Sequence, residues 1–70
     1  MPAAQVLDQY FLEARARLLD LAAILDRIER GAGAETLVDA RRGQINRAIR
    51  ALSENQSNRT EVVQTLFSLT

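Results

Sequence analysis

The chain of 70 residues contains no cysteine, no histidine and no lysine. Without cysteine it forms no disulfide and no thiolate metal site, and it carries no sign of an oxidising compartment. Without histidine it lacks the commonest transition-metal ligand and the commonest general base. No lysine is present to take over the role of a base beside its serines. These absences predict a protein that is not an enzyme and that holds no cofactor or metal.

Neither sign of charge is in excess, because nine arginines balance nine acidic residues. A neutral chain has no overall field to attract nucleic acid or an anionic membrane. Charged residues also interrupt every apolar stretch well before the ~18–20 residues that a bilayer requires. The N-terminus has no basic segment ahead of an apolar run, so it does not resemble a secretory signal. We therefore expect a soluble, cytoplasmic protein without a membrane segment.

Seventy residues suffice for one domain, and we expect residues 1–70 to form a single helical domain. At this size one core usually supplies only about 3–5 kcal/mol, and small proteins add disulfides, a metal or a partner subunit. The composition excludes a disulfide and offers few metal ligands. Self-association is therefore the expected source of additional stability.

The first element predicted is a long helix over residues 3–30, which contains strong helix formers and no glycine or proline. Its apolar positions follow one another at spacings of four, three, four, three, four and three, the pattern of helices packed side by side. We call these positions the seam: Leu7, Phe11, Ala14, Leu18, Leu21, Leu25 and Ile28. Tyr10, Ala22 and Ile24 widen it, so it favours contact with more than one neighbouring helix.

Gly31-Ala32-Gly33 predicts a tight loop over residues 31–33, followed by a second helix over about 34–53. Apolar residues seven apart support this second helix. Gly43 interrupts it at a cost of roughly 1 kcal/mol, which indicates either a close backbone approach or a later helix start. Asp39 is the alternative N-cap, in which case residues 34–38 belong to the connection. We prefer a start near Ala34.

Polar residues 54–58 predict a second loop, and a short third helix over 59–69 follows. Asn58 and Glu61 are spaced as a variant of the capping box. A short strand or a frayed tail is the alternative, because this end is rich in β-branched and aromatic residues. The predicted fold is thus all-α: a long helix, an antiparallel second helix forming a helical hairpin with it, and a short third helix. We expect it to assemble into a multi-helix bundle as a homo-oligomer.

Arginines on the second helix are the candidate nucleic-acid contacts, because clustered guanidinium groups bind phosphates. They are Arg41, Arg42, Arg47 and Arg50. No phosphate-binding loop, zinc finger or helix-turn-helix pattern surrounds them. Ion pairs with Asp20, Asp26 or Glu29, on the first helix or on a second subunit, explain them better in a neutral chain. We therefore do not expect a nucleic-acid partner.

Acidic side chains are the other candidates, since helical bundles can host carboxylate-bound metals. Asp26 and Glu29 lie three residues apart, with Glu35 or Asp39 further along. A magnesium-dependent hydrolase built on these residues is an alternative hypothesis. Charged pairs on the solvent face of a helix are common, however, and they explain the same residues without a metal.

The leading functional hypothesis is a small structural or interaction protein that works through the seam. Its partner is a second copy, with a dimer favoured, or the helices of another protein. A first helix of about 40 Å exceeds the second, at about 30 Å, so part of the seam stays uncovered in a monomer. A contiguous apolar patch of this kind usually marks an interface. A helical hairpin is common to many unrelated proteins, and no family follows from it.

Overall fold

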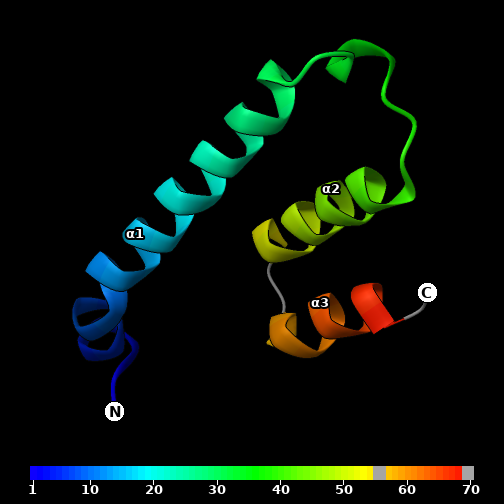
Figure 1. Cartoon of the computed structure of the whole chain (residues 1–70). Helices are drawn as coiled ribbons and strands as arrows, with labels where there is room; N and C mark the ends of the chain where they lie inside the picture. Colours follow the sequence, from blue (N-terminus) through cyan, green and yellow to red (C-terminus); the bar gives the residue numbers. More distant parts are fainter. Residues whose placement is uncertain (55–56, 69–70) are drawn as a thin grey trace. The chain divides into compact units, whose positions relative to one another are not determined.

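The computed structural model describes residues 1–54 and 57–68. Over these ranges the chain forms three α-helices, α1 (Ala3–Arg30), α2 (Ala40–Ser53) and α3 (Arg59–Ser68), together with one 3-10 turn, η1 (Ala34–Thr36), and no strand (Figure 1). The predicted all-α class is confirmed. The chain divides into two compact units, Met1–Leu37 and Val38–Thr70. The predicted packing of α2 against α1 stays a prediction.

The long helix α1 begins and ends where its sequence predicts. Pro2 precedes it in an extended conformation, and the Pro2 carbonyl accepts hydrogen bonds from the amides of Gln5 and Val6 at 3.0 and 3.2 Å. Proline at this place loses nothing, because its missing N–H would have no partner inside the helix. At the other end Arg27 and Arg30 occupy the last turn, where positive charge is favourable. A helix of 28 residues is about 42 Å long.

The connection after α1 is longer than predicted, and the start of the second helix near Ala34 was wrong. Gly33 adopts the left-handed conformation at φ 81°, which glycine enters without steric cost. Its carbonyl then accepts hydrogen bonds from both the amide and the hydroxyl of Thr36, at 3.1 and 3.2 Å, which closes η1. Leu37 is extended, and Val38 is 98% exposed. The loop predicted at 31–33 therefore continues to residue 39.

Asp39 caps α2, as the alternative prediction had it. It is extended, and its Oδ1 accepts a hydrogen bond from the amide of Arg41 at 2.9 Å. Such a cap satisfies one of the amides that the first turn of a helix leaves without a partner. Gly43 nevertheless lies inside α2, where a Cβ would meet only the guanidinium of Arg47 at 3.4 Å. No backbone approaches this glycine among the described residues, so the close approach considered from the sequence is absent there.

Helix α3 follows as predicted from Arg59, and its described part ends at Ser68, with Leu69 outside the described residues. The predicted strand alternative is wrong. The Asn58 carbonyl accepts the Val62 amide at 3.1 Å. Residues 55 and 56 of the predicted loop over 54–58 also lie outside the described ranges.

Helices α2 and α3 lie side by side and antiparallel (Figure 1). Small side chains form the centre of this contact, since Ala48 and Ala51 are each only 7% exposed. Half-buried branched residues surround them: Ile45, Ile49, Val62, Val63 and Leu66. Alanine at a helix contact allows the two backbones to approach closely. No large side chain is fully buried in the described part of the chain, so this core is thin.

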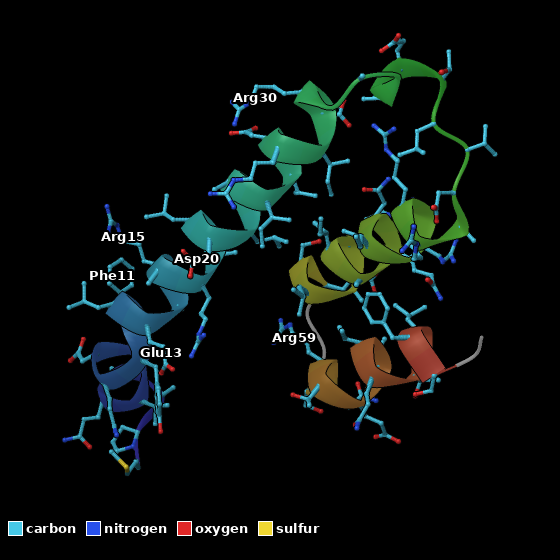
Figure 2. The ribbon with its side chains drawn as sticks, in the orientation of Figure 1. Phe11, Glu13, Arg15, Asp20, Arg30 and Arg59 are labelled. Carbon is cyan, nitrogen blue, oxygen red and sulfur yellow. The ribbon has the colours of Figure 1, made fainter. Side chains whose placement is uncertain are left out.

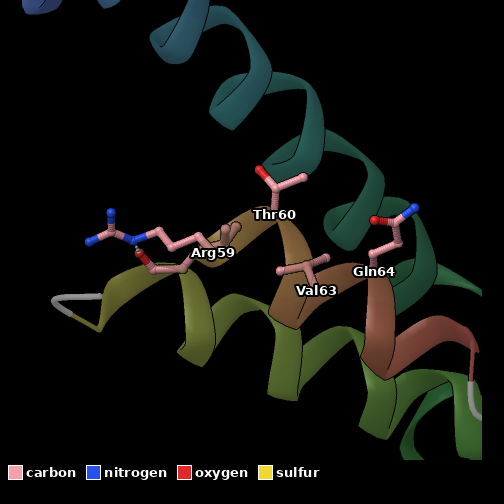
Figure 3. Close-up of a pocket in the computed structure, with 5 residues that line it drawn as sticks. Arg59, Thr60, Val63 and Gln64 are labelled. Carbon is pink, nitrogen blue, oxygen red and sulfur yellow. Dashed lines mark hydrogen bonds between the residues drawn. The ribbon is translucent and has the colours of Figure 1, made fainter. Parts of the chain in front are cut away.

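Arg59, in the first turn of α3, ties α3 to the end of α2 (Figure 3). Its Nε donates to the Leu52 carbonyl at 2.9 Å, and one of its terminal nitrogens donates to the Glu54 carbonyl at 2.7 Å. The last carbonyls of a helix have no partner within it and carry the negative end of its dipole. A guanidinium is therefore a favourable cap for the C-terminus of α2.

Candidate interaction surface

The seam lies on one face of α1. Because α1 runs without interruption from Ala3 to Arg30, residues spaced alternately by four and three stay in register along it. The polar side holds Glu13, whose Oε1 accepts a hydrogen bond from Arg17 at 3.4 Å. Figure 2 shows Phe11 and Glu13 on different sides of the helix. An exposed pair of this kind identifies the solvent face and adds little stability.

The seam is uncovered within its own unit. Leu7 and Leu18 are 62% and 63% exposed, and Phe11 is 54% exposed. Leu21, Leu25 and Ile28, nearer to η1, are half-buried. No residue of α1, all of which is described, is buried. A band of large apolar side chains this long is uncommon on a soluble chain unless something binds it.

An open apolar groove follows part of the seam. It is lined by Phe11, Ala14, Arg15, Leu18, Leu19 and Ala22. The two alanines are its smallest members, and larger side chains stand around them. Leu19 joins this surface although the spacing rule did not include it. Tyr10 and Ile24, on the other flank, are also exposed. Together these residues form an apolar band wider than the stripe that one neighbouring helix covers.

The four candidate arginines do not form one surface. At 100° per residue Arg47 and Arg50 share a face of α2, whereas Arg41 points to another side. Arg47 and Arg50 line a groove between α2 and α3 together with Ala51, Glu54, Val62 and Leu66. The groove thus contains a carboxylate as well as the two guanidinium groups. Arg42 is half-buried on α2.

Arg41 is held by the residue that caps its own helix. Its terminal nitrogen and its Nε donate to the two carboxylate oxygens of Asp39 at 2.8 and 3.1 Å. This bidentate pair, with the amide of Arg41, lowers the pKa of Asp39 to about 2, and Asp39 raises the pKa of Arg41 in turn. Charged hydrogen bonds to the ionised carboxylate favour its charged form. Arg41 thus holds the carboxylate that caps the N-terminus of α2.

The acidic candidates are not brought together into a metal centre. In the described ranges no group of three or more carboxylates is placed to hold an ion, so Asp26, Glu29 and Glu35, which share the first unit, form no such cluster. The same ranges contain no helix that is both long enough and apolar enough to cross a bilayer. Comparisons with protein-family models, with curated proteins and with solved structures found no match to this chain.

Two features of the structure were not predicted from the sequence: the full lining of the groove on α1 and the cap that Arg59 provides for α2. Leu19 and Arg15 also line the groove. A spacing of four and three residues selects only one narrow line along a helix, so it omits residues beside that line. The cap that Arg59 provides has no sequence signal, since its acceptors are backbone carbonyls at Leu52 and Glu54. Every residue has a carbonyl, so side-chain patterns do not indicate which one an arginine will reach.

Proposed function

We propose that this chain is a small, non-enzymatic interaction protein of the cytoplasm, which acts by binding helices through the seam of α1. Those helices belong to a second copy or to a partner protein, and they complete a multi-helix bundle. One observation carries the proposal: a 28-residue helix displays a continuous apolar seam and buries none of its own residues. The predicted hairpin of α1 with α2 belongs to the same proposal.

Energetics support an intermolecular role. Burying one leucine or phenylalanine fully stabilises by about 1.5–3 kcal/mol relative to leaving it in water. The seam carries six large apolar residues besides Ala14, so a partner that covers it gains several such contributions. The second unit buries mainly alanines, which contribute far less area. Catalysis finds no comparable support, because the chain lacks histidine, cysteine and lysine.

The test is the mass in solution, measured by light scattering over a concentration series. A variant carrying Leu18→Glu and Leu25→Glu places two charges in the seam, and we expect it to dissociate the oligomer. The matched control is Leu12→Glu, which makes the same change on the same helix, away from the seam, at a side chain that is 74% exposed. The control is expected to keep the wild-type mass. If wild type and both variants are monomers of equal helix content that bind no helical partner, the proposal is wrong.

A further inference from the structure

We infer that the seam of α1 is covered by α1 of a second copy, running antiparallel, with the two-fold axis near residue 16. This inference rests on the proposed function and names the occupant of the surface. Three observations support it: the length of α1, the order of large and small residues along the seam, and the residues that flank it.

Length favours a second α1 as the partner. The seam with Ala4, which continues it three residues before Leu7, spans about 36 Å up to Ile28. The longest helix of the second unit is α2, whose 14 residues cover about 21 Å. Helix α3 lies beside α2 and not beyond its end, so it does not extend that reach. The only described helix that matches the full length of the seam is α1 itself.

The order of side-chain sizes selects the antiparallel direction. In one antiparallel register each small residue faces a large one: Ala4 faces the partner's Ile28, and Ala14 faces the partner's Leu18. The remaining layers pair large residues, with Leu7 opposite the partner's Leu25 and Phe11 opposite the partner's Leu21. Facing large and small residues fill a helix interface at native density.

A parallel pair does not fill the interface in this way. Each seam residue then faces its own copy, so Ala4 and Ala14 form two layers of paired alanines and Phe11 faces Phe11. Paired alanines leave voids, which cost stability because their walls lose contacts. Shifting the antiparallel pair by seven residues in either direction leaves two seam positions of each copy without a partner. One register therefore pairs all eight positions.

On one side of the seam the two apolar flanking residues agree with the same register, whereas Arg17 between them faces the partner's Arg17. In an antiparallel pair, equivalent flanks of the two helices meet, and Tyr10 then lies against the partner's Ile24. A parallel pair places Ile24 beside the partner's Glu29 and Tyr10 beside the partner's Arg15, which removes the apolar contact. The exposed aromatic ring of Tyr10 and the exposed Ile24 thus cover each other only in the antiparallel dimer.

Disulfide trapping tests the direction and the register, because the chain has no cysteine of its own. Leu7→Cys and Leu25→Cys are made as separate variants and oxidised alone and as an equal mixture. In the inferred dimer two copies of position 7 lie about 27 Å apart along the helices, too far for a disulfide. We expect a covalent dimer only in the mixture, where position 7 faces position 25. Ala4→Cys with Ile28→Cys repeats the test with a small residue replaced at one of the two sites.

The outcomes separate this inference from the proposed function. A covalent dimer from Leu7→Cys alone means a parallel pair, which overturns the inference and leaves the seam as the interface. No trapping in either mixture, in a dimer that Leu18→Glu and Leu25→Glu still dissociate, means that the seam binds something other than α1, and this also overturns it. A wild-type monomer that the two glutamates do not affect overturns this inference, and it overturns the proposed function as well if that monomer binds no helical partner. Light scattering on the reduced cysteine variants shows whether they still associate.

Discussion

The two units of the chain reach helical structure by different routes. In the first, α1 is a 28-residue helix of strong helix formers that buries none of its residues. In the second, α2 and α3 have 14 and 10 residues, and each packs on the other. Short isolated helices are marginal in water, so α2 and α3 depend on their contact and on their caps. The longer α1 forms from local preference, and its apolar face stays exposed within its own unit.

The largest expected effect is a difference in the free energy of unfolding between two variants, each of which replaces one alanine with leucine in one of the two units. Ala48→Leu adds three carbon atoms at the contact of α2 and α3, where the side chain is 7% exposed. Overpacking of this kind costs about 1–3 kcal/mol. Ala16→Leu makes the same change on the exposed face of α1 and is expected to stay within about 0.5 kcal/mol. Urea unfolding followed by circular dichroism measures both. Equal losses would mean that the two units are packed alike.

The sequence predicts α1 better than it predicts α2, because α1 forms from local preference whereas α2 depends on its caps and on its contact with α3. The bounds of α1 are predicted because spacing and helix preference act locally and agree over the whole helix. The start of α2 was misplaced because the apolar period runs on through Val38, although that side chain is 98% exposed. The conformation of Gly33 and the cap from Asp39 decide where α2 starts. Each depends on a single residue, so neither appears in the apolar spacing.

The pairing of helices is harder to predict than their positions. Periodicity shows which face of α2 is apolar, but it does not show whether α1 or α3 covers that face. In the structure α3 packs on it, through Val62, Val63 and Leu66. Of the candidate site, the seam residues were predicted together on one face of α1. The four candidate arginines were also named from the sequence, but they do not form one surface. Arg41 points to a different side of α2 and is bound by Asp39, two residues away.

A smaller effect separates two glycines that differ in backbone conformation, Gly33 in the connection after α1 and Gly43 inside α2. Gly33→Ala is expected to destabilise the connection by about 1 kcal/mol, because the left-handed conformation at φ 81° is unfavourable for a residue with a Cβ. Gly43→Ala is expected to stabilise α2 by about 0.5–1 kcal/mol, since alanine favours a helix and the only side chain within 4 Å among the described residues is a movable guanidinium. Urea midpoints of the two variants check the opposite signs. A loss at Gly43 would instead indicate that a partner helix approaches α2 there.

The smallest expected effect concerns pH and the start of α2. Because the pKa of Asp39 is lowered to about 2 from 3.8, its contribution to stability is present above about pH 4 and is lost as the pH falls through about 2. Asp39→Asn keeps a capping oxygen but removes the charge. Wild type is therefore expected to be slightly more helical than this variant at pH 7 and equal to it below pH 2. Circular dichroism of both proteins across this range measures the difference. A constant difference at every pH would mean that the carboxylate charge plays no part.

The cap that Arg59 provides has a consequence for the order in which the second unit folds and opens. One guanidinium holds the last carbonyls of α2 from the first turn of α3, over a separation of only seven residues to Leu52. Contacts this local form early and at a low entropic cost. The last turn of α2 and the first turn of α3 are therefore expected to fray together. This junction is the expected nucleus of the unit, and hydrogen exchange should be slowest around Ala51 and fastest at the opposite ends of the two helices.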